Sequence, residues 1–182
     1  MRKPKAIKSE DVERILLHLN GQDKLIFRVC VETGLRVSDV LNLRAWYIER
    51  LITVQEGKTG KFRTVELSEG LYRALLPRKL SAVRTGDKEV HAFRSARKPS
   101  VSVHRSGYHR RLKKVCRLLG VDFSAHSARK LFAQELMRST GDIFVVQKAL
   151  NHKFLTDTCN YLDIDLGGLI KAATELKQVL KK

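Results

Sequence analysis

The fold of this chain is organised around residues 33–44, whose sequence is TGLRVSDVLNLR. Thr33-Gly34 is expected to stop the helical segment before it, because glycine readily terminates helices. Apolar residues then recur at helical spacing and predict a new helix that buries Val37, Val40 and Leu41. Arg36 is therefore expected at a helix start, shortly after a glycine.

Two helices are predicted before this stretch. Ser9 is a candidate N-cap for the first, which Asn20-Gly21 ends and whose apolar face comprises Val12, Ile15, Leu16 and Leu19. The second opens at Asp23 and ends at Thr33-Gly34. Both helices supply apolar residues for a core.

A β-hairpin is predicted after the stretch. Two β-prone runs, residues 51–54 and 62–67, bracket the segment EGKTGK at 56–61. The glycines of this segment are typical of a tight connection. Lys58 is expected in the hairpin tip.

The rest of the chain is predicted to be mainly helical. Expected are a helix at 68–76 ended by Pro77, an extended piece at 90–93, a basic helix that buries Leu112, Val115, Cys116 and Leu119 and ends at Gly120, and helices at 125–139, 143–150 and from 156. The fold class is thus mixed, mainly α with a small antiparallel β-sheet. We expect a basic, linker-like lead-in at 1–8, one domain at 9–165 and an amphipathic tail helix at 166–182.

Net charge points to a polyanionic partner. The 182 residues include 36 Lys and Arg against 19 Asp and Glu, a formal charge of +17. Such a surface attracts nucleic acid, although a solvated cationic surface or an RNA binder of the ribosomal type has the same charge. Hydrophobic residues make up 43% of the chain, enough for a real core.

One basic run is a candidate DNA-contacting surface. Residues 94–117 hold nine Lys or Arg and no acid. Although such runs are often only solvated faces, the overall charge favours a surface that tracks phosphates. The candidate contacts are Arg94, Arg97, Lys98, Arg105, Arg110, Arg111, Lys113 and Lys114.

The cysteine and hydropathy patterns limit the cellular compartment and the cofactors that we expect. Cys30, Cys116 and Cys159 form no CxxC pair, which argues against a disulfide framework or a zinc knuckle. His104 and His109 lack a third plausible metal ligand nearby. No run approaches the roughly 20 apolar residues of a membrane span. We expect a cytoplasmic protein with no membrane partner, no metal and no cofactor.

Two arginines are candidates for binding a phosphate. Arg129 follows His126 by three residues, which places both side chains on one helix face. An arginine fork donates two parallel hydrogen bonds and stays charged, so Arg36 and Arg129 together suit the extra charge of a pentavalent phosphorane.

Four further residues complete the candidate set for metal-free phosphodiester transfer. His126 and His152 can donate to a phosphate or accept a proton, and Lys58 can protonate a departing sugar oxygen. Tyr161 is the candidate nucleophile, although a phenol titrates near pH 10 and needs an acceptor or neighbouring cations. Each residue alone has an ordinary surface or packing interpretation; the joint pattern carries the argument.

These residues resemble the conserved positions of tyrosine recombinases, the phage integrase and Xer family. TGLRVSDVLNLR, with Arg36, looks like the family's first arginine box, and Lys58 in EGKTGKFRTVEL resembles its hairpin lysine. AHSARKLFAQEL, with His126 and Arg129, resembles its HxxR box, while LNHK and TDTCNYLD resemble its late histidine and nucleophilic tyrosine. The resemblance spans roughly residues 6–165.

The resemblance implies a tyrosine recombinase catalytic domain that cuts one strand of double-stranded DNA at a time. Tyr161 would form a 3′-phosphotyrosyl bond and release a 5′-hydroxyl, with neither ATP nor a metal. Asp39 would buttress the site. The chain would act as a homo-oligomer on DNA, a dimer to tetramer, with the tail helix packed on a neighbouring subunit.

Several departures and alternatives accompany the resemblance. Lys130, Asn151 and Ser127-Ala128 replace common family residues without removing a catalytic group. We expect no N-terminal DNA-binding domain, as in a naturally short recombinase or an isolated catalytic domain of prokaryotic, phage or mobile-element origin. Two other functions compete with this one: that of a topoisomerase-like nicking and closing enzyme, and that of a non-catalytic DNA-binding regulator. Integration, excision, inversion and resolution stay open.

Overall fold

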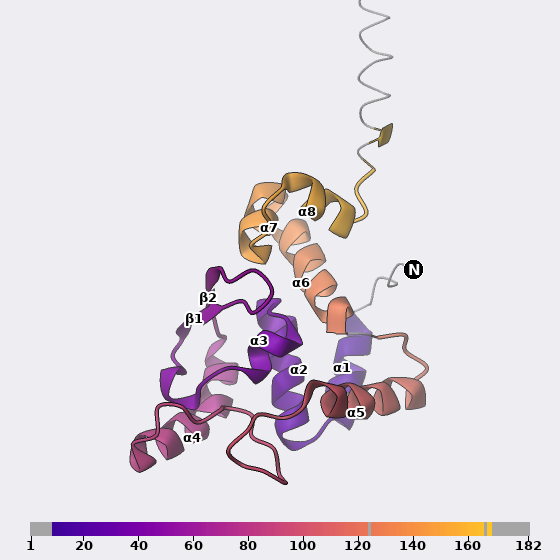
Figure 1. Cartoon of the computed structure of the whole chain (residues 1–182). Coiled ribbons are helices and arrows are strands. Elements are labelled where there is room, and N and C mark those ends of the chain that lie inside the picture. Colours follow the sequence, from indigo (N-terminus) through magenta and orange to yellow (C-terminus); the bar gives the residue numbers. More distant parts are fainter. Residues whose placement is uncertain (1–8, 124, 166, 169–182) are drawn as a thin grey trace, which may run out of the picture. The chain divides into compact units, whose positions relative to one another are not determined.

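The chain forms two compact units in the computed structural model, which describes residues 9–123, 125–165 and 167–168. The described residues up to 132 belong to the first unit, and those from 133 belong to the second (Figure 1). The expected lead-in at 1–8 and nearly all of the expected tail at 166–182 lie outside the described residues.

Helices dominate both units, as the sequence predicted. In chain order the elements are α1 (Ser9–His18), α2 (Gly21–Thr33), α3 (Val37–Leu41), the 3-10 turn η1 (Ala45–Tyr47), β1 (Leu51–Gln55), β2 (Phe62–Glu66), α4 (Glu69–Thr85), α5 (Arg105–Leu118), α6 (Ala125–Thr140), α7 (Ile143–Leu150) and α8 (Leu155–Tyr161). The predicted fold class, mainly α with a small antiparallel sheet, is confirmed.

The sheet is the two-stranded hairpin that the β-prone runs predicted. Strands β1 and β2 pair in antiparallel register, from Leu51 opposite Glu66 to Gln55 opposite Phe62. Alternate residues point to the interior, since both strands show the same exposed–buried alternation. The expected extended piece at 90–93 forms a single isolated bridge, which joins His91 to Arg44, instead of a strand.

The predicted end of the fourth helix at Pro77 is wrong. Helix α4 continues through Pro77 to Thr85, and Ser68 caps its start by accepting the Leu71 N–H at 3.2 Å. An internal proline removes one helical hydrogen bond. Here the apolar face continues on both sides of the proline and buries Leu71, Leu75 and Ala82. The packing of that face outweighs the local loss.

The core of the first unit lies around α2. Its apolar residues Ile26, Phe27, Val29 and Cys30 are buried, and the rings of Phe27 and Phe123 lie 5.1 Å apart. Helix α5 buries Leu112 and Cys116 as predicted, together with Tyr108. Val115 and Leu119, which were also predicted to be buried, are only partly so.

The second unit holds α7 and α8. Asp142 caps α7 by accepting the Phe144 N–H at 2.7 Å. Asn151 ends the helix in the left-handed conformation, with φ of 56°. Asparagine tolerates this conformation better than most residues.

Within the described part of the chain, no helix is both long and apolar enough to cross a membrane.

Candidate functional site

Arg36 is positioned by the turn between α2 and α3. Gly34 ends α2 with φ of 63°, and its N–H donates to the Cys30 carbonyl at 3.0 Å. A Cβ at Gly34 would lie 2.4 Å from the Phe132 ring, so both the backbone angle and the space require glycine. Arg36 then occupies the N-cap position of α3, at the helix start where the sequence placed it.

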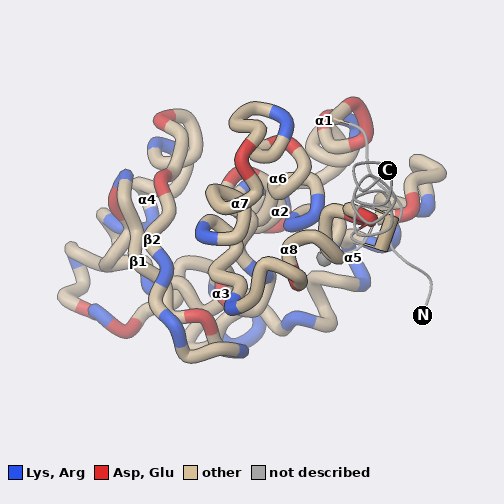
Figure 2. The backbone as a smooth tube through the Cα atoms, turned by 90° about the horizontal axis from the view of Figure 1, so that it is seen from above, with Lys and Arg blue, Asp and Glu red and all other residues tan. Residues whose placement is uncertain are grey.

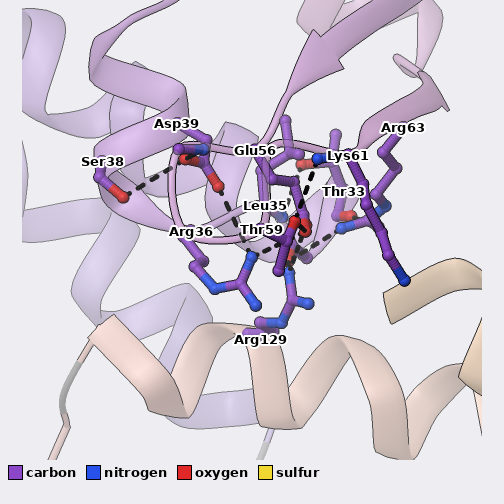
Figure 3. A network of polar contacts seen from close by, with 12 residues as sticks. Thr33, Leu35, Arg36, Ser38, Asp39, Glu56, Thr59, Lys61, Arg63 and Arg129 are labelled. Carbon is purple, nitrogen blue, oxygen red and sulfur yellow. Dashed lines mark hydrogen bonds and ion pairs between the residues drawn. The ribbon is translucent and has the colours of Figure 1, made fainter. Parts of the chain in front are cut away.

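Arg129 reaches the same turn from α6. Its residue is 3% exposed, and its Nη1 donates to the Gly34 carbonyl at 2.8 Å. The turn between α2 and α3 therefore joins the two predicted arginines, which lie 93 positions apart in the sequence. Figure 3 shows both guanidinium groups facing the end of the hairpin.

Glu56 connects these two arginines. Its Oε2 lies 2.9 Å from Arg36 Nη1, and its Oε1 lies 3.5 Å from Arg129 Nη1 (Figure 3). The side chain is fully buried, and the Thr59 hydroxyl donates to Oε2 at 3.1 Å. Burial by itself raises the pKa of the Glu56 carboxyl, but the Arg36 guanidinium and the charge of Arg129 outweigh it, so the pKa lies below its ordinary value.

Two more charged residues, Arg63 and Asp39, lie beside the two arginines. Arg63 on β2 is buried and donates to the Gly34 carbonyl at 3.3 Å and to the Thr33 carbonyl. Burial, with repulsion from Arg129, lowers the pKa of Arg63 to about 10, which leaves it charged at neutral pH. Asp39 is buried and accepts the Gly57 N–H at 3.0 Å.

We call Arg36, Asp39, Glu56, Arg63 and Arg129 the arginine cluster. Three guanidinium groups face two carboxylates, so the cluster has one positive charge in excess. Arg36 Nη1 is also 3.9 Å from Asp39 Oδ2. An excess of positive charge in a cluster that is open to solvent only at Arg36 suits an anion such as a phosphodiester.

Sequence reasoning missed Glu56 and Arg63, although the alternation of the hairpin contains the signal. Glu56 directly follows β1 and continues the buried positions of Ile52 and Val54, and Arg63 shares the interior face of β2 with Val65. Period-two alternation therefore places both charges inward, beside apolar neighbours.

Lys58 lies in the exposed turn at the tip of the hairpin, as predicted. The turn is braced at its base, because the Gly60 N–H donates to the Glu56 carbonyl at 2.8 Å. Gly60 has φ of 68°, which the turn requires. His126 lies on α6, three residues before Arg129, and its side chain is outside what the structure describes.

His152 and Tyr161 lie side by side in the second unit. Their ring centroids are 5.7 Å apart, with the ring planes at 83°. His152 Nδ1 is 3.0 Å from the hydroxyl of the fully buried Thr158. Both rings are half-buried. The structure thus groups the candidate histidine with the candidate nucleophile, and it groups Arg36 with Arg129 in the first unit.

The eight candidate DNA contacts are all exposed. Arg94, Arg97 and Lys98 precede α5, and the other five lie on it, where blue segments recur in Figure 2. Helix α5 presents them outward because its opposite face is buried in the core. Arg111 is already paired, since its Nη2 donates to Asp23 Oδ1 at 2.8 Å.

Known proteins are similar to this chain in sequence. The sequence model described as the phage integrase family matches residues 5–166. Tyrosine recombinase XerA of Thermococcus kodakarensis is 31% identical over 186 residues, which cover 98% of this chain and 64% of the relative. The chain thus spans less than two thirds of that relative's length.

Solved structures share the fold. The crystal structure of XerA recombinase aligns with a TM-score of 0.73 at 24% identity, covering 96% of this chain and 66% of that one. The Tn1549 transposon integrase, solved in complex with transposon right end DNA, aligns with a TM-score of 0.70 at 17% identity, covering 96% and 66%.

Proposed function

The chain belongs to the phage integrase family, and on that premise we propose that it is a site-specific DNA recombinase that cuts and rejoins strands through a 3′-phosphotyrosyl intermediate. The observation that carries this proposal is the arginine cluster. Its excess positive charge is fixed before DNA arrives, which is the arrangement that stabilises charge developing on a phosphate.

The proposed reaction exchanges one phosphodiester for another. The Tyr161 oxygen attacks the scissile phosphorus, a histidine accepts the phenol proton, and the bond to the 5′ oxygen breaks. Lys58 gives that oxygen its proton, and a 5′-hydroxyl is released. In the second step a 5′-hydroxyl of the partner DNA attacks the phosphotyrosine and restores the phenol. The ester is conserved throughout, so the reaction needs no external energy source.

Arg36 and Arg129 act on the phosphate in this proposal. Each donates to non-bridging oxygens, whose charge increases in the pentavalent transition state. His126 and His152 serve as donors to the phosphate or as proton acceptors. The 5.7 Å separation of the His152 and Tyr161 rings supports a role for His152 beside the nucleophile.

The proposed partners are double-stranded DNA and further copies of the chain. The exposed cations of 94–114 bind the backbone, and residues 166–182 dock on a neighbouring subunit in the assembly on DNA. A gel shift tests this arrangement. Truncation after Asp165 is expected to keep single-site binding and to remove cooperative assembly on paired sites. Unfolding of the truncated protein would instead show that the tail packs within its own chain.

A nicked half-site tests the chemistry. The cleaved fragment diffuses away from such a substrate, so a covalent protein–DNA adduct that survives denaturant accumulates. Tyr161→Phe is expected to form none, because the attacking oxygen is absent. Tyr47→Phe is the matched control, since Tyr47 is an exposed tyrosine outside the candidate site. An adduct formed by Tyr161→Phe would contradict the assignment of the nucleophile.

A further inference from the structure

Glu56 is a buried charge to which neither the predicted site nor the proposed chemistry gives a role. Its side chain has no exposed surface, and isolated buried carboxylates are costly. Each of its two carboxylate oxygens contacts a different arginine, Arg36 at 2.9 Å and Arg129 at 3.5 Å. A single rigid, planar group thus sets the spacing between two guanidinium groups that would otherwise repel each other.

Glu56 also forms the base of the turn that carries Lys58. Its N–H donates to the Lys61 carbonyl at 2.9 Å, and its own carbonyl accepts the Gly60 N–H. The Thr59 hydroxyl donates to its side chain at 3.1 Å. One residue therefore contacts both arginines and closes the loop on which the candidate general acid lies.

Glu56 could either support the two arginines or compete with a phosphate for them. The exposed fractions of Glu56 and Arg36 distinguish these two roles. A carboxylate between two arginines can mimic a phosphate and would then have to leave when DNA binds. The Arg36 side chain is 21% exposed, whereas the Glu56 side chain is 0% exposed. A phosphate therefore approaches Arg36 from its exposed side while Glu56 stays on the buried side.

We propose that Glu56 is a positioning residue for DNA cleavage, which holds Arg36 and Arg129 at the spacing that a phosphate requires and ties them to the Lys58 turn. This inference rests on the proposed function. Glu56 touches neither DNA nor the reacting atoms. It acts through the two arginines and the turn.

The test compares Glu56→Gln with the wild type on saturating nicked half-site DNA. The amide keeps the shape of the side chain and removes the negative charge that holds the two arginines together. We expect the cleavage rate to fall by about 10²-fold, the scale of a 1 Å misplacement in an active site. The DNA dissociation constant should change less than threefold, because the exposed cations dominate binding. Glu66→Gln, an exposed glutamate on β2, is the matched control.

Two further variants extend the test, and the first of them keeps it decisive if Glu56→Gln folds poorly. Thr59→Val removes the exposed hydroxyl that donates to Glu56 and accepts the Lys61 N–H at 3.4 Å, and it should lower the cleavage rate severalfold with little change in the unfolding midpoint. In an Arg36→Ala background, Glu56→Gln should lose much of its own effect, because a residue that acts through Arg36 is not additive with it.

Several outcomes would overturn the inference. Cleavage by Glu56→Gln at the wild-type rate would remove the role. Faster cleavage or tighter DNA binding would show that Glu56 competes with the phosphate. A loss that saturating DNA restores would assign Glu56 to binding alone. Failure of the wild type to form any adduct would contradict the proposed function itself and is therefore distinguishable.

Discussion

The arginine cluster and the His152–Tyr161 pair differ in how the fold holds them. All members of the cluster except the partly exposed Arg36 are buried, and its charges contact one another and backbone carbonyls across a helix turn, a hairpin and α6. The His152 and Tyr161 rings are half-buried; His152 lies in the turn between α7 and α8, and Tyr161 is the last residue of the seven-residue helix α8. Fixed charges stabilise a transition state only if they do not reorganise during the reaction. A nucleophile, by contrast, must reach its substrate.

The largest effect is expected for the arginines of the cluster. Arg36→Ala and Arg129→Ala should each lower cleavage of saturating nicked DNA by about 10²–10³-fold or more, the loss typical of one donor to a developing charge. Arg129→Ala should also lower the free energy of unfolding, because it leaves the buried Gly34 carbonyl with one donor fewer. Arg50→Ala, which removes an exposed arginine, is the control. Cleavage at the wild-type rate by Arg36→Ala or Arg129→Ala on saturating DNA would contradict the role given to the arginine cluster.

Loss of the imidazole in the second unit should affect rate more than stability. His152→Ala is expected to lower cleavage by about 10²-fold, the lower range for a general acid or base. Its unfolding free energy should fall by about 1–2 kcal/mol, since the hydrogen bond to Thr158 and the edge contact with the Tyr161 ring are lost. Single-turnover cleavage and urea unfolding measure the two effects. Thr158→Val tests the orientation of the ring, and an unchanged rate would show that this hydrogen bond is dispensable.

Gly34→Ala tests how much the turn that positions Arg36 contributes to the stability of the fold. Gly34→Ala should lower the unfolding free energy by about 2 kcal/mol or more, because the left-handed conformation costs an L-residue about 1–2 kcal/mol and the methyl group meets the Phe132 ring. Urea unfolding measures the loss. Gly60→Ala is matched, since Gly60 also has positive φ but open space around it. Equal losses in the two variants would show that the contact with Phe132 is unimportant.

The smallest expected effect concerns acid stability. The pKa of Glu56 lies below its ordinary value in the folded chain, so its contribution to stability is complete above that ordinary value and is lost as pH falls through the folded pKa. Between pH 5 and pH 2, the unfolding free energy of Glu56→Gln should therefore fall less than that of the wild type. The pKa of the exposed Glu69 is lowered too, by hydrogen bonds to Arg73 and Arg50, and salt should screen that part. A pH profile that Glu56→Gln leaves unchanged would contradict this prediction.

Local patterns predicted most elements because they depend on near neighbours in the sequence. The hairpin followed from two β-prone runs around a glycine-containing segment, and α3 followed from apolar spacing after Gly34. The prediction failed at Pro77, where a local helix breaker lies within a longer apolar face. The packing of that face against the core decides the length of α4, and no short window contains that information.

The candidate site likewise has features that the sequence predicts and features that only the tertiary structure shows. The sequence by itself predicted the six candidate residues and the basic surface, and its strand alternation also contained the inward direction of Glu56, which was not predicted. Only the tertiary structure decided that Glu56 contacts both Arg36 and Arg129 and that Gly34 accepts hydrogen bonds from both Arg63 and Arg129. Arg129 is 95 residues from Gly34 in the chain. Contacts across such separations depend on how buried faces pack, whereas the periodicity of a sequence records only which faces are buried.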